Sequence, residues 1–350
     1  MADNHNKVRR MYNLKKFRGA VRTGSLTATA MVLCACGGAM DGDQMAEETY
    51  VIKFPHVTAP GTPKGRTAER FKELVEERFP DKVTVEVYPS SQLMNDDDSL
   101  EALAFGEIQM IAVSLSKFDR LTQAFQIFDL PFLFPDLTTV EAFQASPAGQ
   151  DLLNVISDKG FLGLAFWHNG MKQFSGPMPL RLPENAEGLK FRIMESDVLQ
   201  AQVQAIGGNP QKMALGEVYQ ALQTGAIDAQ ENTWSNIFSS KFFEVQPYVM
   251  ETNHGYIGYF VAVNPDFWLS LPTDIRTGVE DALNEATAWG NAQSEEINQT
   301  ARNNVAESGR SEIVNLNDEE LSVWRETMAP VWQQFEDQIG AERIAAAAAL

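Results

Sequence analysis

The chain has 350 residues, of which 44% are hydrophobic and 21% are charged. This composition is typical of a globular chain with room for two domains, and it excludes a disordered chain or one built mainly of membrane spans. The formal net charge of −19 disfavours nucleic acid as a partner, because the phosphates would be repelled.

The first 35 residues are predicted to be a targeting segment. Seven Lys and Arg residues precede the apolar stretch Leu26 to Leu33, which is too short to span a bilayer. The run Leu33-Cys34-Ala35-Cys36 resembles a lipobox, in which Cys36 becomes the lipidated first residue of the mature chain. A plain secretory signal that is cleaved elsewhere is the alternative. Residues 36–48 are small and polar, as expected of a tether.

Removal of residues 1–35 leaves 21 basic and 46 acidic residues, a net charge of −25. The negative charge of the whole protein opposes an anionic ligand, so a local group of cations must capture it. At physiological salt the field of the whole protein is screened beyond about 8 Å, and short-range charge pairs decide binding. Both cysteines lie near the amino terminus, so no disulfide framework is predicted for the folded body. Its three histidines show no metal-ligand spacing, and no metal or cofactor is expected.

The first half of the folded body alternates strand and helix patterns. A helix from about Gly65 to Arg78 and another that ends at Phe105 are predicted. A turn at residues 168–170 is expected, and the aromatic run Phe128 to Phe134 is predicted to pack in the core and between domains. The predicted strands of this half are Tyr50 to Phe54, Val83 to Tyr88, Ile108 to Val113 and Phe161 to Trp167.

Two polar residues of this half are candidates for anion binding. Lys64 lies where a loop meets the start of a helix, a place where the helix dipole disfavours a cation unless an anion is near. A solvated lysine is the alternative. Ser114 follows the carboxyl end of a buried strand, where its hydroxyl could bind an anion or cap the next turn.

The segment from Gly188 to Trp234 reads as strand, helix, strand, helix, strand. In such an α/β layer the strand ends face a crevice where ligands bind. The predicted parts are a strand at Leu189 to Met194, a helix with Asp197 as N-cap that stops at Gly207-Gly208, a short apolar strand at Met213 to Leu215, a helix at Glu217 to Leu222 and a strand at Ile227 to Thr233.

Arg192 and Asn232 lie on the first and last strands of this segment. Phe191 and Ile193 flank the arginine, so the opposite face of its strand points to a core. A guanidinium accepts a carboxylate through two parallel hydrogen bonds, and an amide can add a donor to the same anion. An ion pair between Arg192 and a neighbouring carboxylate is the alternative.

The carboxyl-terminal part is predicted to be mostly helical. One pattern runs from about Thr273 to Glu307 and would extend roughly 50 Å, longer than one small domain. A helical tail follows from Leu321 to Ile344, and the alanine run from 345 to 349 is predicted to fray. The motifs of serine hydrolases, zinc proteases and P-loop enzymes are missing, which argues against an enzyme.

Several segments together resemble the solute-binding component of TRAP (tripartite ATP-independent periplasmic) transporters, in its C4-dicarboxylate branch, DctP. They are TPKG at Thr62 to Gly65, SLSKF at Ser114 to Phe118, FDLPFLF at Phe128 to Phe134, NGMKQFS at Asn169 to Ser175, and then GLKFRI, EVYQALQTGAIDAQENTWSN and NHGY. The resemblance implies an α/β, two-lobed fold like that of periplasmic binding proteins. Each lobe would be a β-sheet flanked by helices, with a long helix spanning both.

The implied division is a lipoprotein-type signal peptide at residues 1–35, a tether at 36–48 and two lobes. Lobe I would hold residues 49–169 plus about 258–297, and lobe II residues 170–257 plus about 298–350. The implied function is capture of malate, succinate or fumarate between the closing lobes and delivery to a membrane permease. The protein would be periplasmic and would contact the membrane only through its lipid anchor and the permease.

The resemblance also implies the ligand contacts. Arg192 and Asn232 would hold one carboxylate, and Lys64, Lys172 and Ser114 the other. Lys172 stands where sialic-acid binders of the family carry arginine. Candidates for the pocket wall are His56, Leu215, Trp234 and His254, although Trp234 could instead pack the core and His254 could be a structural histidine. Another organic acid, such as a sugar acid or 2-oxo acid, and an exported enzyme for an anionic substrate are the alternatives.

Overall fold

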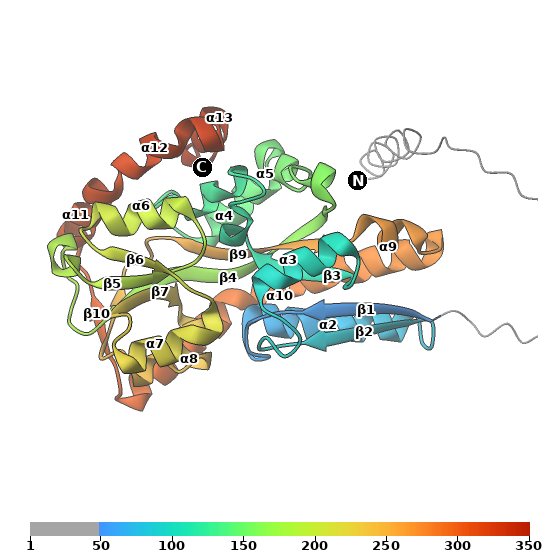
Figure 1. Ribbon diagram of the computed structural model, residues 1–350, viewed down its shortest axis with the longest axis horizontal. Coiled ribbons are helices and arrows are strands. Elements are labelled where there is room, and N and C mark those ends of the chain that lie inside the picture. The colour runs from blue at the N-terminus through green and yellow to red at the C-terminus, as the bar shows by residue number, and fades with distance from the viewer. Residues whose placement is uncertain (1–48) are drawn as a thin grey trace, which may run out of the picture. The chain divides into compact units, whose positions relative to one another are not determined.

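A computed structural model describes residues 49–350 (Figure 1). The predictions for residues 1–48, including the lipidation of Cys36, lie outside the described residues. Within the described part the fold is α/β, as predicted, with sheets flanked by helices.

Strand β4 (Leu162–Gly176) is the axis of the main sheet (Figure 1). Along the sheet the order is β10-β8-β4-β7-β5-β6, and β9 pairs with both β4 and β3. A separate parallel pair is formed by β1 and β2. The bounds are β1 Tyr50–Pro55, β2 Val83–Tyr88, β3 Met110–Ser114, β5 Lys190–Ile193, β6 Asn209–Lys212, β7 Ala229–Thr233, β8 Tyr248–Glu251, β9 Tyr256–Val263 and β10 Glu312–Asn315.

Strand β4 changes partners along its length. Its first part, up to Met171, pairs with β9, and its second part, from Lys172, pairs with β7 and β8. The turn predicted at residues 168–170 is therefore wrong, because these residues belong to the strand. The pairing with β9 shifts register between His168 and Gly170, so a β-bulge stands where the sequence indicated a turn.

The long predicted helix is present as α10 (Thr273–Ser308). Its 36 residues extend about 54 Å at the usual rise per residue. It contacts α2, which packs on β2, and it also contacts β4 and α8. The helix therefore packs along both the β1–β2 pair and the main sheet. Gly290 allows the close approach to α2, since a Cβ there would overlap the Thr67 hydroxyl. The other helices before it are α2 Pro63–Arg78, α3 Asp96–Phe105, α4 Leu137–Ala145, α5 Pro147–Leu152, α6 Asp197–Ala205, α7 Val218–Thr224, α8 Trp234–Ser239 and α9 Pro265–Ser270.

The carboxyl-terminal tail is not one helix but three, α11 (Asp318–Met328), α12 (Pro330–Ile339) and α13 (Ala341–Ala348). Pro330 occupies the first turn of α12, where it needs no hydrogen-bond donor, and Gly340 separates α12 from α13. The alanine run predicted to fray is helical up to Ala348, the last residue of α13, and Ala347 is buried against the core.

Two further predictions in the segment from 188 to 234 are corrected. The N-cap of α6 is Ser196, whose hydroxyl accepts from the Leu199 amide, and Asp197 is the first helical residue. The middle strand is β6, immediately before the apolar run at Met213. It is an edge strand with mostly exposed side chains, so its sequence carries no apolar signal, and Pro210 is tolerated there.

A hydrophobic core surrounds β3 and β9 and includes Phe128 and Phe134, so the predicted core packing of the FDLPFLF run is confirmed. Aromatic rings pack edge to face there, with centroid distances of 5.2 Å for Phe118–Phe125 and 5.3 Å for Phe118–Phe260. This core holds the carboxyl end of β3 in place. No helix within residues 49–350 has the length and apolar content needed to cross a bilayer.

Candidate ligand-binding site

A small cavity of about 30 Å³ lies near the carboxyl ends of β3, β5 and β7. This is the place that the rule for strand ends in α/β sheets predicts. Its wall mixes cationic, amide and hydroxyl groups with apolar side chains. The lining residues are Val57, Thr58, Asp96, Ser114, Lys117, Arg192, Met194, Leu215, Asn232, Asn236, Ile257 and Tyr259.

Arg192 lies on β5 and is only 3% exposed. Its Nε donates to the Met213 carbonyl at 2.9 Å, which fixes the plane of the guanidinium. No hydrogen bond among residues 49–350 uses its two terminal nitrogens. Burial lowers the pKa of Arg192, while the nearby carboxylates of Glu231 and Glu195 raise it. The guanidinium therefore presents two donors at the cavity in the geometry that a carboxylate accepts.

Asn232 and Ser114 line the same cavity, as the sequence predicted. The Asn232 Oδ1 accepts from Asn236 Nδ2 at 2.8 Å and from the Thr233 amide at 3.2 Å, so the Nδ2 of Asn232 is left to donate elsewhere. Ser114 ends β3 and starts a 3-10 turn, but its side chain makes no capping hydrogen bond. The capping alternative for Ser114 is therefore wrong, and its hydroxyl is available at the cavity.

Lys64 does not line the cavity. Its side chain is fully buried, its Nζ donates to the Ala112 carbonyl at 3.0 Å, and it lies 3.9 Å from the centre of the Tyr259 ring. Because Tyr259 lines the cavity, Lys64 stands behind that wall. Burial lowers the pKa of Lys64 to about 8, against the opposing effect of Asp96. Lys64 remains cationic at neutral pH and adds positive potential to the site.

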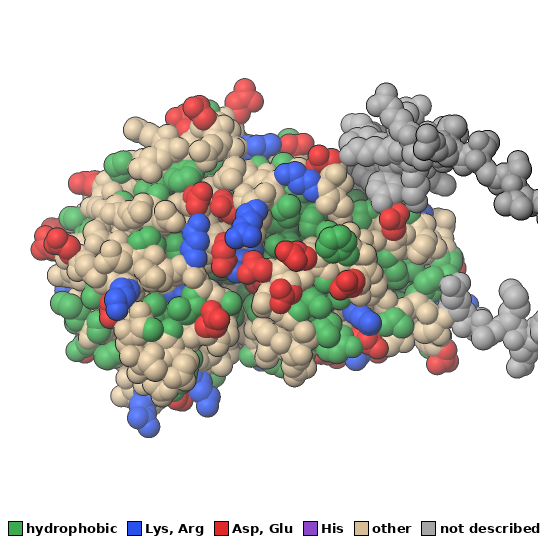
Figure 2. Space-filling view, viewed as in Figure 1, with side chains coloured by type: hydrophobic (Ala, Val, Ile, Leu, Met, Phe, Trp, Pro, Cys, Tyr) green, Lys and Arg blue, Asp and Glu red, His purple; other side chains and the backbone are tan. Residues whose placement is uncertain are grey.

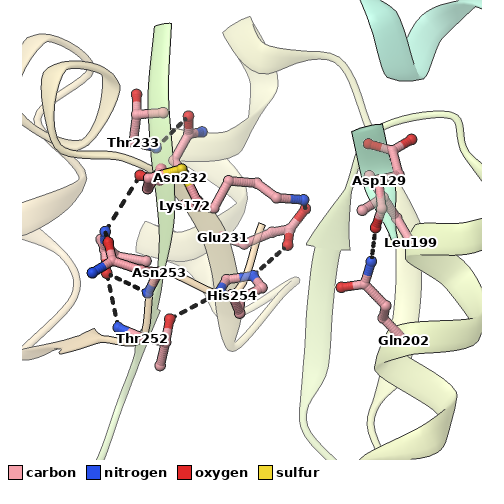
Figure 3. Close-up of polar contacts among 12 residues, drawn as sticks. Asp129, Lys172, Leu199, Gln202, Glu231, Asn232, Thr233, Thr252, Asn253 and His254 are labelled. Atoms are coloured by element: carbon pink, nitrogen blue, oxygen red, sulfur yellow. Dashed lines mark hydrogen bonds and ion pairs between the residues drawn. The ribbon is translucent and has the colours of Figure 1, made fainter. Parts of the chain in front are cut away.

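Lys172 is also fully buried outside the cavity lining. Its Nζ lies 2.8 Å from Glu231 Oε1, and Glu231 Oε2 lies 2.8 Å from His254 Nε2 (Figure 3). The Thr252 hydroxyl extends this row of polar contacts with a hydrogen bond to His254 Nδ1 at 2.7 Å. Burial alone would raise the pKa of Glu231, but Lys172 and His254 lower it to about 2. Lys172 is thus held in an internal ion pair.

Of the four residues predicted for the pocket wall, one lines the cavity and three do not. The one that lines it is Leu215. His56 is buried beside it, and burial together with the Lys64 charge lowers its pKa to about 3, so its ring is neutral. Trp234 lines a different cavity, where Arg302 lies over its ring. His254 is buried between Glu231 and Phe174, whose ring it stacks on at 3.7 Å.

Sequence reasoning missed Lys117 and Asp96, which both line the cavity. Lys117 lies in the SLSKF segment, only 4% of its side chain is exposed, and its Nζ pairs with Asp97 at 3.0 Å and with Glu195. Figure 2 shows acidic and basic side chains interleaved near the place where α3 and α6 lie in Figure 1. The signal for Lys117 was its place three residues beyond Ser114; Asp96 resembled an ordinary acidic residue in a first helical turn.

No group of three or more metal-ligating side chains is placed to hold an ion within the described part of the chain. The cavity offers charged groups and hydrogen-bond donors. These are the properties of a site that binds a small organic anion.

Comparison with known proteins identifies the family. The sequence profile of the bacterial extracellular solute-binding proteins, family 7 (DctP), matches residues 54–338. The chain belongs to this family. It is a TRAP solute-binding protein, which binds solutes and is not an enzyme.

The DctP chain is similar over most of its length to named relatives. It is 51% identical over 298 residues to the C4-dicarboxylate-binding periplasmic protein DctP of Shewanella loihica, covering 85% of this chain and 89% of the relative. A TRAP periplasmic solute-binding protein from Shewanella oneidensis, solved with bound succinate, has a TM-score of 0.85 at 50% identity, covering 86% and 99% of the two chains. One from Pseudomonas aeruginosa, solved with bound L-malate, has a TM-score of 0.80 at 44% identity, covering 81% and 99%.

Proposed function

We propose that this DctP protein captures a C4-dicarboxylate, such as malate, succinate or fumarate, and delivers it to the membrane permease of a TRAP transporter. The observation that carries the proposal is the buried Arg192 fork, whose two terminal nitrogens face a cavity with a second cation, Lys117. Two cations that line one cavity suit a molecule with a carboxylate at each end. The names and bound ligands of the similar proteins support the same ligand class.

One carboxylate of the ligand is proposed to bind Arg192 and Asn232. The other would meet Ser114 and Lys117, which line the same cavity, with Lys64 and Lys172 adding positive potential or contacts. Hydrogen bonds to charged groups contribute roughly 1.5–3 kcal/mol each. Three or four of them, less the cost of ordering, give about −8 kcal/mol, which corresponds to micromolar affinity.

Binding is proposed to close two lobes with the boundaries expected from the sequence, 49–169 plus about 258–297 and 170–257 plus about 298–350. Ser114 and Lys117 would come from the first lobe, and Arg192 and Asn232 from the second. A cavity of about 30 Å³ holds about one water molecule, so a C4 acid could enter only when the walls move apart. The ligand would then favour closure because it bridges residues of both lobes.

A screen of organic acids tests the proposal. Succinate, malate and fumarate are expected to raise the thermal unfolding temperature of the protein, whereas galactonate and pyruvate should have little effect. Solution scattering of the same samples should show a smaller radius of gyration with succinate. A shift caused only by the sugar acid or the 2-oxo acid would favour the alternative ligand class, and a shift without contraction would contradict lobe closure.

The family places the protein in the periplasm, and we propose that Cys36 anchors it there after removal of residues 1–35. The support is the lipobox-like run before Cys36 and the short polar segment after it. Cells that express the protein should incorporate labelled palmitate into it, and Cys36→Ser should remove the label. Absence of label from the unaltered protein would instead indicate a soluble secreted form.

A further inference from the structure

Asp96 is an acidic residue in the wall of a cavity proposed to bind a dianion. Among the lining residues, all of which lie within the described range, it alone carries a carboxyl group. It is 7% exposed and is the first residue of α3. The start of a helix stabilises a negative charge, which explains how the sequence keeps an acid there. It does not explain why the acid borders an anion site.

The carboxylate of Asp96 receives no hydrogen bond from any residue between 49 and 350. The cations near it have other partners: Lys64 donates to the Ala112 carbonyl, and Lys117 pairs with Asp97 and Glu195. With 7% of the residue exposed, the carboxylate keeps only a little contact with water at the cavity wall, and a hydrogen bond from a ligand would replace that contact. Asp96 is therefore left for a donor that arrives with the ligand.

Arg192 and Asp96 line the same cavity, so a dicarboxylate that is held by Arg192 and enclosed when the lobes close would lie near Asp96. Two carboxylates in contact cannot both stay ionised at low cost, and such pairs share one proton. The shared proton replaces repulsion with a strong O–H···O⁻ hydrogen bond. It also supplies the donor that Asp96 lacks.

We propose that this protein binds its dicarboxylate together with one proton, held between the Asp96 carboxyl and a carboxylate of the ligand. The inference rests on the proposed function. No covalent bond forms or breaks: a proton from solvent joins the ionised Asp96 and the dianion as they meet. Asp96 thereby becomes a direct contact of the ligand.

The charges around Asp96 are compatible with proton uptake. Burial raises its pKa first of all, Lys64 on α2 and Lys117 after β3 lower it, and Asp97 and Glu195 raise it further. Arg192 on β5 also interacts with this carboxylate. The dianion would add one more negative charge to this balance and favour the protonated form.

Calorimetry of succinate binding at pH 7, in buffers with different ionisation enthalpies, measures the protons taken up. Close to one proton per succinate is expected for the unaltered protein, and affinity should fall by about tenfold per pH unit above neutrality. Lys64, with a pKa of about 8, can account for only about a tenth of a proton at pH 7. Succinate is the probe of choice because it has no hydroxyl that could donate to Asp96 instead.

Asp96→Asn keeps the shape of the side chain and supplies an N–H donor without a titrating proton. This variant should bind succinate with a tenth of a proton or less and with a flat pH profile. Asp98→Asn is the matched control, since it removes the same charge from the same helical turn at an exposed position that does not line the cavity; its proton uptake should be unchanged.

The outcomes separate the two proposals. Succinate binding without proton uptake, or uptake that persists in Asp96→Asn, overturns this inference and leaves the proposed function intact. No binding of any C4 diacid to the unaltered protein overturns the proposed function and this inference with it.

Discussion

Replacement of Arg192 by Ala is expected to weaken succinate binding by roughly 30- to 4,000-fold. The physical reason is that the ligand carboxylate would lose a bidentate partner inside a buried site, and truncating a buried hydrogen-bonded charge pair costs about 2–5 kcal/mol. No other lining residue can replace the fork, since Lys117, the other lining cation, has no planar guanidinium and is proposed to meet the second carboxylate. Titration calorimetry with succinate measures the loss.

Two variants make the result specific. Arg192→Lys keeps the charge but loses the planar fork, so its affinity should fall between those of the unaltered protein and the Ala variant. Arg181→Ala removes an arginine that pairs with Glu320 at the surface, with 51% of its side chain exposed, and should leave binding unchanged. Unaltered succinate affinity in a folded Arg192→Ala variant would remove Arg192 from the site.

The residues that could be predicted from the sequence share a local signal. Arg192, Asn232 and Ser114 each stand on or at the end of a strand whose pattern is readable, and the strand ends of an α/β sheet meet at one crevice. The structure places all three around one cavity. Leu215, which the resemblance implied as a wall residue, also lines the cavity, and it lies three residues after the end of the edge strand β6.

The residues that could not be predicted depend on contacts between distant segments. Lys172 meets Glu231 across 59 positions of the chain, and His254 meets the same carboxylate across 23. A lysine read alone offers no sign of such a partner. Asp96 has the opposite problem: as one of three aspartates in the first turn of α3 it resembles its exposed neighbours, and only folding shows that it is buried.

Local ambiguity explains the errors in the fold. Ser196 and Asp197 are both good N-caps, and only the backbone geometry selects the serine. The edge strand β6 contains Pro210 and polar residues, which argue against a strand when the sequence is read alone. Residues 168–170 form a β-bulge, and the polar residues and glycine found there are also typical of a turn, so the sequence could not distinguish the two.

Glu231→Gln is expected to lower the free energy of unfolding by about 3–5 kcal/mol at pH 7, because it leaves Lys172 charged and buried without a counter-charge. Denaturant titration measures the loss. Glu285→Gln, which alters an exposed pair with Arg78, should cost less than about 1 kcal/mol. The double variant Lys172→Met with Glu231→Gln should recover part of the stability, since the unpaired charge is gone.

The pH dependence of the stability that the Lys172–Glu231 pair contributes follows from the lowered pKa of Glu231. The folded value of about 2 lies below the ordinary value of 4.5, so the carboxylate stabilises the fold above about pH 4.5 and this stabilisation is lost as the pH falls toward 2. The difference between the unaltered protein and Glu231→Gln should shrink over that interval. If instead the variant is as stable as the unaltered protein at pH 7 but binds succinate poorly, the pair serves the ligand rather than the fold. Lys172 would then return to the site as a contact for the second carboxylate.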